Sequence, residues 1–398
     1  MRVLLVSQYF APEAGATQNR MSSFAQGLMA RGHEVIVVCE QPCHPGGVFH
    51  PSYGSHPVRT ERAGALTVHR LWVAASPRKT TARRLAFYAS FAAAAAATVA
   101  EVRRPDVLLA TSPPLPGVLA VAAVARARRI PFVVDVRDPW PAAAEALGEL
   151  TNRRLVRLFE RAERGLYLHA RAVTATTEPF RRHVDRVAGR PVGIHLPNGA
   201  LDELVALPVT DPPPAEPFVV GYAGNLGIAQ GLGIVLDAAE RLEDRPVRFD
   251  LVGAGPLAEE LAAEIARRSL GNVVILSPIP VAEVGGFLQR CHALLVPLRD
   301  HPLLADFIPS KLYDAMAVGR PAIVASHGEA AALVERSQAG VVVGPEDGAA
   351  LAQTVMDLVG DSARARRLGA NGRLAAAKLS RSSQLNLLEQ TLRRATAA

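Results

Sequence analysis

The chain has 398 residues and half of them are apolar (49%), so it is long enough for two domains with a hydrophobic core each. Its three cysteines, Cys39, Cys43 and Cys291, exclude a disulfide framework and suit a reducing compartment, so we expect a cytoplasmic protein. The apolar run after Met1 is too short for a signal peptide. The most apolar stretch, residues 85–100, is mostly alanine and too short to span a membrane.

The charge is distributed unevenly along the chain. Residues 1–200 contain 26 Lys and Arg against 14 Asp and Glu, a net charge of +12, whereas residues 201–398 contain 18 against 23, a net charge of −5. A basic first half favours an acidic partner, such as nucleic acid, an anionic membrane surface or a phosphate-bearing substrate. An arginine-rich composition without any such partner is the alternative. We expect no nucleic-acid partner, because no recognition motif accompanies the basic residues.

Short β-branched runs alternate with helical patterns rich in Ala, Leu and Arg, which predicts parallel βα units. In the first half a helix is predicted at residues 22–31, ended by Gly32. The predicted strands of this half are residues 3–7, 34–39, 106–111, 132–136 and 172–177. These runs are apolar throughout, as in strands that are covered on both faces.

A Pro-rich stretch at residues 208–217 interrupts this pattern, which begins again after it. The predicted strands of the second half are residues 218–224, 249–255, 273–277, 293–298 and 321–326. We therefore predict an α/β protein of two Rossmann-like, doubly wound domains that face a central cleft, with ligands at the carboxyl ends of the strands. The predicted parts are a first domain at 1–200, a linker at 201–217, a second domain at 218–380 and a C-terminal helix at 381–398 that packs back on the first domain.

Several motifs of other protein classes are absent or incomplete. None of the three lysines, Lys79, Lys311 and Lys378, follows a glycine, which excludes a P-loop. Residues 253–258, GAGPLA, match a loose dinucleotide pattern, but the next strand lacks the acidic end residue that holds the ribose of NAD. The Cys and His residues between 39 and 50 match no standard zinc spacing. We therefore expect no cofactor and no metal, and interpret the glycines as a turn near a nucleotide.

Residues 306–321 suggest chemistry most strongly. A strand ends near Leu298, and after a loop a helix is predicted to begin at about Ser310. A helix amino terminus presents free N–H groups and a positive dipole end, and Lys311 adds a full charge where a diphosphate would lie. Asp314, one turn further on, could accept hydrogen bonds from ribose hydroxyls, and Asp306 is predicted on the loop that faces the cleft. The alternative is an ordinary helix with Ser310 as its N-cap and both acids solvated.

This segment resembles the donor-binding stretch of the family-4 retaining glycosyltransferases, in which two acidic residues, usually Glu, flank seven others. Asp306 and Asp314 stand at these two places here. The resemblance implies that the first contacts the donor sugar and the second the ribose. Other segments resemble the WbuB-like branch of the family, which builds surface polysaccharides, and they occur in the family's order. They are residues 7–20, 30–38, 111–116, 136–141, 176–180, 196–200 and 221–232.

The resemblance implies a GT-B glycosyltransferase that transfers a sugar from a nucleotide-sugar, with uridine preferred, by a retaining and metal-independent reaction. The acceptor hydroxyl would belong to a glycan, a polyprenyl-diphosphate-linked sugar or a small molecule, bound by the first domain. Two alternatives remain open on the same fold. One is a UDP-sugar 2-epimerase, which needs acid/base residues in the cleft, and the other is a catalytically decayed nucleotide-sugar-binding protein.

The expected catalytic residues are Lys311, Asp306, Arg137 and Asp138, and no metal ligand is expected. The expected donor-binding residues are Gly15, Ala16, Gly224, Asn225, Gln230, Gly253, Ser277, Pro278, Ser310, Lys311, Leu312 and Asp314. Many family members have Arg and Lys where Asn225 and Gln230 stand, and a His where Arg137 stands. Neutral amides supply no charge, so Lys311 and helix dipoles would carry more of the neutralisation. A buried Arg137–Asp138 ion pair that braces the turn at Trp140 is the structural alternative.

A membrane is the remaining candidate partner. Basic residues flank the alanine-rich helix at both ends: Arg78, Lys79, Arg83 and Arg84 precede it, and Arg103 and Arg104 follow it. Such flanks could set the helix on the inner face of an anionic bilayer, as in a peripheral membrane protein. Alanine is only weakly apolar, however, so a packed internal helix is the alternative.

Overall fold

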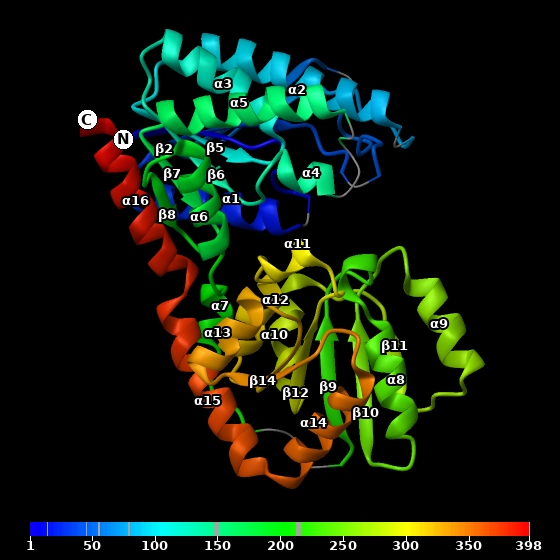
Figure 1. Ribbon diagram of the computed structural model, residues 1–398. Coiled ribbons are helices and arrows are strands. Elements are labelled where there is room, and N and C mark those ends of the chain that lie inside the picture. The colour runs from blue at the N-terminus through cyan, green and yellow to red at the C-terminus, as the bar shows by residue number, and fades with distance from the viewer. Residues whose placement is uncertain are drawn as a thin grey trace. The chain divides into compact units, whose positions relative to one another are not determined.

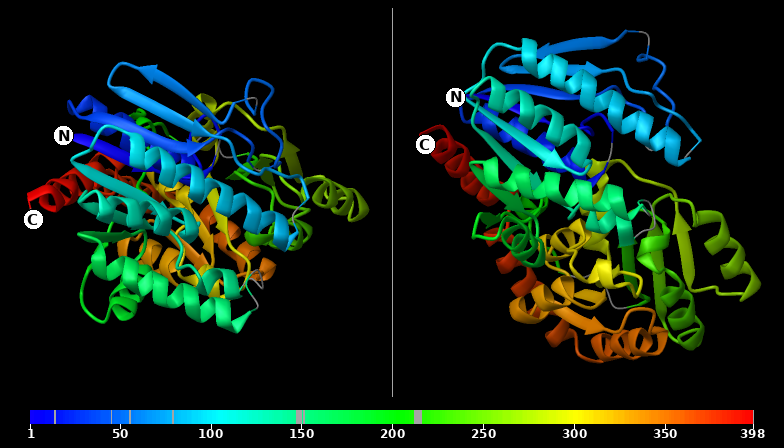
Figure 2. Two further views of the ribbon diagram at one scale, coloured as in Figure 1. Left: turned by 90° about the horizontal axis from the view of Figure 1, so that it is seen from above. Right: turned by 45° about the horizontal axis from the view of Figure 1, so that its top comes forward.

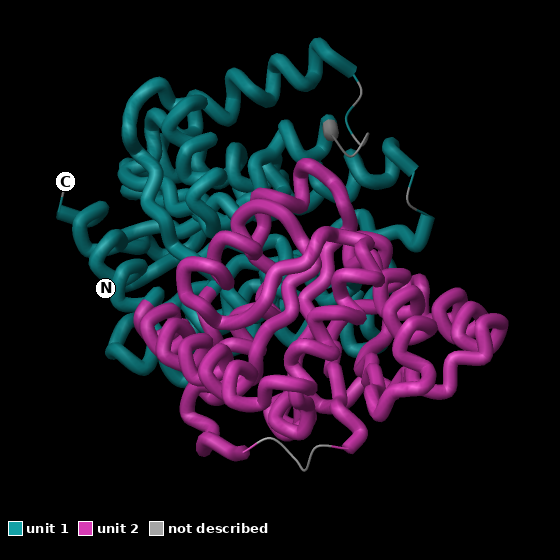
Figure 3. Tube along the Cα trace, turned by 60° about the horizontal axis from the view of Figure 1, so that its bottom comes forward, with its two compact units in different colours: residues 1–198, 384–398 teal, residues 199–383 magenta. Residues whose placement is uncertain are grey.

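The computed structural model describes residues 1–397 except 14, 45, 55, 79, 147–149, 151 and 212–215 (Figure 1). The chain divides into two compact units, Met1–Asn198 with Gln384–Ala398, and Gly199–Ser383 (Figure 3). Residues 201–211, the greater part of the expected linker at 201–217, lie in the second unit and include α7 (Asp202–Ala206). Its proline-rich residues 212–215 lie outside the described residues.

The first unit contains an eight-stranded sheet in the order β3-β4-β2-β1-β5-β6-β7-β8, in which only the β3–β4 pair is antiparallel among the described strands. Its strands are β1 (Arg2–Val6), β2 (Glu34–Glu40), β3 (Val58–Ala63), β4 (Leu66–Leu71), β5 (Val107–Ser112), β6 (Phe132–Val136), β7 (Ala172–Ala175) and β8 (Gly193–His195). Val3 of β1 pairs with Val35 and Val107 on one face and Leu4 pairs with Ile36 and Leu108 on the other, so apolar residues fill both faces of the centre. Because the strand order reverses between β1 and β5, the loops after these strands flank the switch point of this sheet.

Helices cover both faces of this sheet. The helices are α1 (Ala16–Ala30), α2 (Thr81–Glu101), α3 (Leu115–Ala127), α4 (Ala142–Ala146), α5 (Arg153–His169), α6 (Glu178–Ala188) and α16 (Arg381–Ala397). Residues of α2, α3, α5 and α6 share one buried cluster, and those of α1 and α16 share the cluster of the other face (Figure 2). Glu389 of α16 pairs with Arg31 and His33, which ties this helix to α1 and the turn after it.

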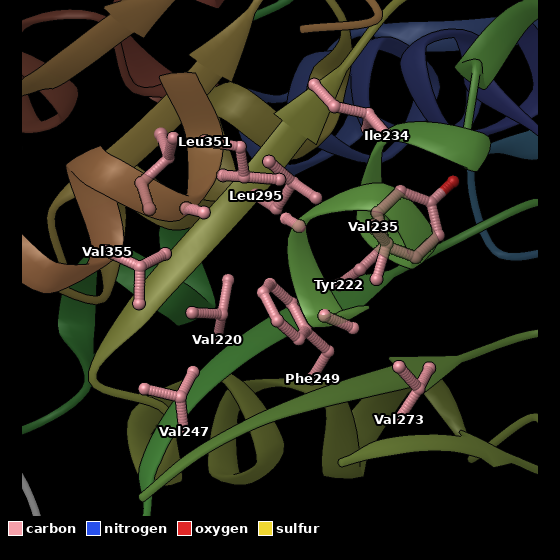
Figure 4. Packing of buried hydrophobic residues seen from close by; sticks show 14 of the residues in the cluster. Val220, Tyr222, Ile234, Val235, Val247, Phe249, Val273, Leu295, Leu351 and Val355 are labelled. Atoms are coloured by element: carbon pink, nitrogen blue, oxygen red, sulfur yellow. The ribbon is translucent and has the colours of Figure 1, made fainter. Parts of the chain in front are cut away.

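The second unit contains a six-stranded parallel sheet in the order β11-β10-β9-β12-β13-β14. The strands are β9 (Phe218–Ala223), β10 (Val247–Val252), β11 (Val273–Leu276), β12 (Ala293–Pro297), β13 (Ala322–Ala325) and β14 (Gly340–Val343). The remaining helices are α8 (Gly233–Arg241), α9 (Ala258–Arg267), α10 (Val281–Arg290), α11 (Pro302–Ala305), α12 (Ser310–Ala317), α13 (Glu329–Ser337), α14 (Gly348–Gly360) and α15 (Ser362–Lys378), with a 3-10 turn at Ile228–Gln230. Figure 4 shows the core between the sheet and α8 and α14, where Phe249 lies among aliphatic residues of the sheet and of these helices. The strand order reverses between β9 and β12, which places the switch point beside the loops that follow these two strands.

Two parallel-sheet α/β units confirm the predicted fold class, and the ten predicted strands are all present. The sequence patterns missed the β3–β4 hairpin, β8 and β14. Five of the six residues of β3 are exposed and its sequence is polar, because it is an edge strand without the apolar run on which the prediction relied. No helix in the described part of the chain combines the length and the hydropathy that a membrane crossing needs.

Candidate functional site

The loops after β9 and β10, next to the switch point of the second sheet, meet through glycines. Gly224 has φ +151° and Gly253 has φ +150°, a backbone region that side chains rarely adopt. A Cβ on Gly253 would lie 1.9 Å from the carbonyl oxygen of Gly224, and one on Gly255 would lie 2.3 Å from that of Leu226. The GAG turn therefore serves close packing of two loops, and leaves backbone rather than side chains at this edge.

Lys311 lies beside these glycines. It belongs to the first turn of α12, and its Nζ donates a 2.7 Å hydrogen bond to the hydroxyl of Tyr222. The same ammonium group is 4.1 Å from the centre of the Tyr222 ring, and a Cβ on Gly224 would lie 2.8 Å from it. Burial lowers the pKa of Lys311 to about 8, and the charge of Asp314 opposes that shift only in part. The site thus holds a desolvated cation whose nearest polar contact is a neutral phenol, an environment that an anionic ligand would complete.

The amino end of α12 adds hydrogen-bond donors next to this cation. Pro309 occupies the N-cap position without a side-chain cap, so Ser310 is the first helical residue, and the alternative that made it the N-cap is wrong. Within the described residues, the N–H groups of Ser310 and Lys311 have no acceptor. These two N–H groups and the positive end of the helix dipole are a suitable environment for a phosphate.

Leu312 does not share this role. Its N–H donates to the carbonyl of Pro309 at 3.0 Å, and its side chain is fully buried in the core of the second unit. It has neither a backbone nor a side-chain group available to a ligand, so we remove it from the expected donor-binding set. The sequence analysis expected free N–H groups at this helix start, and the tight turn at Pro309 uses that of Leu312.

The two aspartates of the segment lie in different surroundings. Asp314 is on α12, one turn after Lys311 and partly exposed. Burial raises its pKa to about 6, although the charges of Arg381 and Lys311 lower it. Asp306 is exposed and caps the carboxyl end of the short helix α11. Asp314 therefore interacts with Lys311 through its charge. Asp306 lies further away along the chain, in the segment between β12 and α12.

The neutral residues Asn225 and Gln230 converge at the loop after β9. A Cβ on Gly227 would lie 2.5 Å from Nδ2 of Asn225 and 2.9 Å from Oε1 of Gln230. The hydroxyl of Tyr222 donates to the Asn225 carbonyl at 2.6 Å, so this loop is joined to Lys311 through one phenol. Oε1 of Gln230 is buried and has no hydrogen-bond partner among the described residues, which leaves an acceptor for a ligand or a water.

Ser277 and Pro278 follow β11 and are exposed. The N–H of Gly253 donates to the carbonyl of Leu276 at 3.2 Å, so both residues begin at the same sheet edge as the glycine turn. In the sheet, β10 separates β11 from β9, so Ser277 and Pro278 lie on the side of β10 that is away from Lys311. This is the order along the edge in which a diphosphate and then a base could lie.

In the first unit the expected residues gather at the carboxyl ends of β1, β5 and β6. Gly15 is the N-cap of α1 in an extended conformation, and Ala16 is its exposed first residue. Arg137 donates from its guanidinium to the hydroxyl of Thr17 and from its N–H to the carbonyl of Ser112. Burial lowers the pKa of Arg137 and raises that of Asp138. No ion pair joins Arg137 and Asp138 in the described structure, so the bracing pair is not observed, and the Nε of Arg137 has no partner there.

Two structural features of the site were missed by the sequence analysis. Tyr222 holds Lys311, but within an apolar strand it gave no signal beyond that of a core residue. Arg20 forms a buried bidentate pair with Asp135 at 2.9 and 3.1 Å and also donates to the carbonyls of Leu196 and Pro197. Although burial acts to raise the pKa of Asp135, Arg20 lowers it, so the pair stays charged. It fixes α1 against β6 and thereby positions the loop that contains Gly15.

Three side chains of the first unit have ligand atoms within 4.8 Å of one another: Glu13, Glu40 and Cys43. Oε1 of Glu13 already accepts the N–H groups of Cys43 and His44, at 2.7 Å each. Burial raises the pKa of both Glu40 and Cys43, which favours a neutral acid and a neutral thiol. Because metal ligands must be deprotonated, this cluster is better suited to bracing the loop after β2 than to holding an ion.

Two family models match the chain. Residues 15–199 match the glycosyl transferase 4-like domain, and residues 217–361 match glycosyl transferases group 1. The chain therefore belongs to the glycosyltransferases of the GT-B type, and it is an enzyme of that class. It is similar to the putative colanic acid biosynthesis glycosyl transferase WcaI of Escherichia coli, with 27% identity over 81% of this chain and 83% of that protein. It also resembles the D-rhamnosyltransferase WbpZ of Pseudomonas aeruginosa, with 30% identity over 38% of each protein.

Solved structures share the fold. Sucrose-phosphate synthase from Thermosynechococcus elongatus has a TM-score of 0.74 at 17% identity and covers 100% of this chain and 99% of its own. Anabaena HepE, solved in complex with UDP, has a TM-score of 0.73 at 18% identity and covers 99% of this chain and 100% of its own. At these identities the likeness establishes the GT-B fold and nothing more about this chain.

Proposed function

We propose that the second unit binds the diphosphate of a nucleotide-sugar at Lys311 and the amino end of α12, and that the enzyme transfers the sugar to a hydroxyl acceptor. The observation that carries this proposal is the desolvated Lys311 ammonium beside two open N–H groups. In the reaction, the bond between the anomeric carbon and the phosphate oxygen breaks. A bond from that carbon to the acceptor oxygen forms, the acceptor loses a proton, and the nucleoside diphosphate leaves.

Charge accumulates on the leaving diphosphate, so fixed cations and N–H donors directed at it stabilise the transition state most. Lys311 supplies the full charge, and Ser310 and Lys311 supply N–H groups. This arrangement supports a metal-independent transfer, and the retaining stereochemistry belongs to the same proposal. Asn225 and Gln230 would contribute neutral hydrogen bonds to the phosphates, where charged residues would have added to the neutralisation.

Asp314 would accept hydrogen bonds from the ribose, and the exposed Asp306 would contact the donor sugar. The base would lie toward Gly253, Ser277 and Pro278, along the edge described above. Uridine is the preferred base: a neighbour in fold, HepE, has been solved with UDP and with UDP-glucose. Arg137 and Asp138, at the carboxyl edge of the first sheet, would act on the acceptor side. The name of WcaI supports a glycan acceptor, and a polyprenyl-diphosphate-linked or small-molecule acceptor is part of the same proposal.

The test replaces the lysine and follows turnover. Incubation with a panel of UDP-sugars, read by mass spectrometry, should give transfer or slow hydrolysis, and Lys311→Ala should lower the rate about a hundredfold, as loss of other single oxyanion donors does. Lys378→Ala is the matched control, because Lys378 is exposed in the last turn of α15. Formation of an epimer would support a 2-epimerase, tight binding without turnover a decayed enzyme, and equal rates for Lys311→Ala and the control would remove Lys311 from the reaction.

A further inference from the structure

The outer surface of α2 and α3 in the first unit is apolar over an unusual length. Helix α2 buries Phe91, Ala95 and Val99 against the sheet, so the packed alternative holds for one face of the helix only. On its outer side every exposed residue between 85 and 100 is an alanine or a leucine: Leu85, Ala86, Ala89, Ala93, Ala97 and Ala100. Leu85 is 52% exposed. An exposed helix face normally carries charged side chains, and this one carries none for four turns.

Helix α3 continues this surface. It packs beside α2 on the same face of the sheet, as Figures 1 and 2 show, and its sequence contains no charged residue before Arg126. Its exposed Ala123 and partly exposed Ala120 extend the apolar area. We call this the α2–α3 face, defined by the exposed residues of 85–100 together with Ala120 and Ala123. Contiguous exposed apolar area of this kind marks an interaction site.

Arginines surround the α2–α3 face. Arg83 and Arg84 lie in the first turn of α2, and the segment 102–104 after the helix contains Arg103 and Arg104. Arg126 lies in the last turn of α3, and Arg128 and Arg129 follow the helix. The neighbouring α5 exposes Arg153, Arg154, Arg157, Arg161 and Arg164. Residues 78–100 contain no acidic residue, and neither do residues 115–129, whereas Glu101 at the end of α2 and Glu160 of α5 are exposed acids beside the arginines. Lys79, which the sequence adds to this group, lies outside the described residues.

We propose that the α2–α3 face docks on the surface of an anionic lipid bilayer, with the arginines against lipid phosphates and the alanines and Leu85 at the acyl boundary. Charge complementarity selects this occupant: a second copy of the chain would bring one arginine rim against another. The exposed Leu155 and Leu158 of α5, 38% and 58% exposed, lie among its arginines and add apolar contact of the same kind. Alanine contributes little transfer free energy, so the arginines carry much of the binding, which must therefore weaken with salt.

The experiment compares sedimentation of the full chain with phosphatidylcholine vesicles and with vesicles that also contain phosphatidylglycerol, at low and high salt. We expect binding to the anionic vesicles alone, and its loss at high salt. Arg83→Gln should weaken it about fivefold, and Ala93→Glu, which puts a carboxylate in the middle of the face, at least about tenfold. Glutamate is a good helix former, so Ala93→Glu should fold, as circular dichroism and thermal unfolding will verify.

Matched controls are Ala263→Glu on α9 and Arg367→Gln on α15, the same exchanges at exposed helical positions of the second unit. Both should bind as the wild type does. Absence of binding, equal binding to neutral and anionic vesicles, or undiminished binding by both Ala93→Glu and Arg83→Gln would overturn the proposal. A wild-type dimer in sedimentation velocity that Ala93→Glu converts to a monomer would assign the face to a second copy and overturn it too. None of these outcomes depends on donor binding, so the proposed function stands or fails separately.

Discussion

Binding of a nucleotide-sugar should be accompanied by uptake of a proton at Lys311. In the free protein burial lowers the pKa of this ammonium group to about 8, from the 10.5 of an exposed lysine. A diphosphate within contact distance favours the charged form and should return the pKa toward its ordinary value. Protein that is neutral at Lys311 must therefore gain a proton to form the complex.

The size of the effect follows from the pKa. With a value of about 8, roughly three quarters of the molecules are neutral at Lys311 at pH 8.5, so binding should take up about three quarters of a proton there and about a tenth of one at pH 7. Linkage fixes the sign of the effect. The affinity for the UDP-sugar is greatest below pH 8 and falls above it, about tenfold per pH unit, until the pH reaches the pKa of Lys311 in the complex. Asp314, whose pKa is about 6, is ionised at pH 8.5 and adds nothing to the exchange.

Calorimetric titration with a UDP-sugar at pH 8.5, in buffers of different ionisation enthalpy, measures this uptake directly. A UDP-sugar is the right ligand because its diphosphate diester does not titrate in this range. In Lys311→Met the buffer dependence should vanish together with most of the affinity. If the wild type binds with no proton exchange at pH 8.5, or Lys311→Met exchanges as many protons, Lys311 does not face the diphosphate.

Two further predictions concern the same edge of the second sheet. Because a buried lysine with a lowered pKa is destabilising below that pKa, Lys311→Met should raise the stability of the ligand-free protein at pH 7 by about 1–3 kcal/mol. The gain, read by thermal unfolding, should shrink between pH 8 and 10.5, and a loss of stability at pH 7 would contradict it. Gly253→Ala should cost about 1–3 kcal/mol and weaken UDP-sugar binding, because φ is +150° and the new Cβ would meet the Gly224 carbonyl. Gly271→Ala, with nothing within 4 Å of its Cβ, is the control, and equal stability and affinity of the two variants would refute the argument.

The elements that sequence reasoning recovered are those in which one physical signal dominates. Strands such as β1 and β12 are buried on both faces, so their apolar runs identify them without further context. Lys311 could be placed in the first turn of a helix, because a helix start between a strand end and a terminal glycine predicts where that turn lies. The polar edge strand β3 has neither signal, since its side chains meet solvent and its stability comes from pairing with β4.

The remaining features of the site depend on distances that spacing does not encode. Tyr222 is 89 residues from Lys311, and only the register of β9 beside β12 brings its hydroxyl within 2.7 Å of the ammonium group. The exclusion of Leu312 depends on a single hydrogen bond to Pro309 that tightens the first turn. Sequence patterns predict which elements converge at a sheet edge, whereas the register and the turns decide which atoms are open to a ligand.

The same distances explain why a lysine stands at position 311 in a chain with three lysines and 41 arginines. The Nζ lies 4.1 Å from the centre of the Tyr222 ring and so close to Gly224 that a Cβ there would come within 2.8 Å of it. A planar guanidinium is broader than an ammonium group. Lys311→Arg should therefore stay positively charged at every pH of the assay, but its guanidinium should not fit the position that the ammonium group occupies. We expect kcat/KM for transfer to fall between about tenfold and a hundredfold, close to the loss in Lys311→Ala, while its decline above pH 8 disappears because arginine stays protonated. An arginine variant that retains wild-type kcat/KM would mean that charge alone suffices. One that retains the decline above pH 8 would mean that another group titrates there.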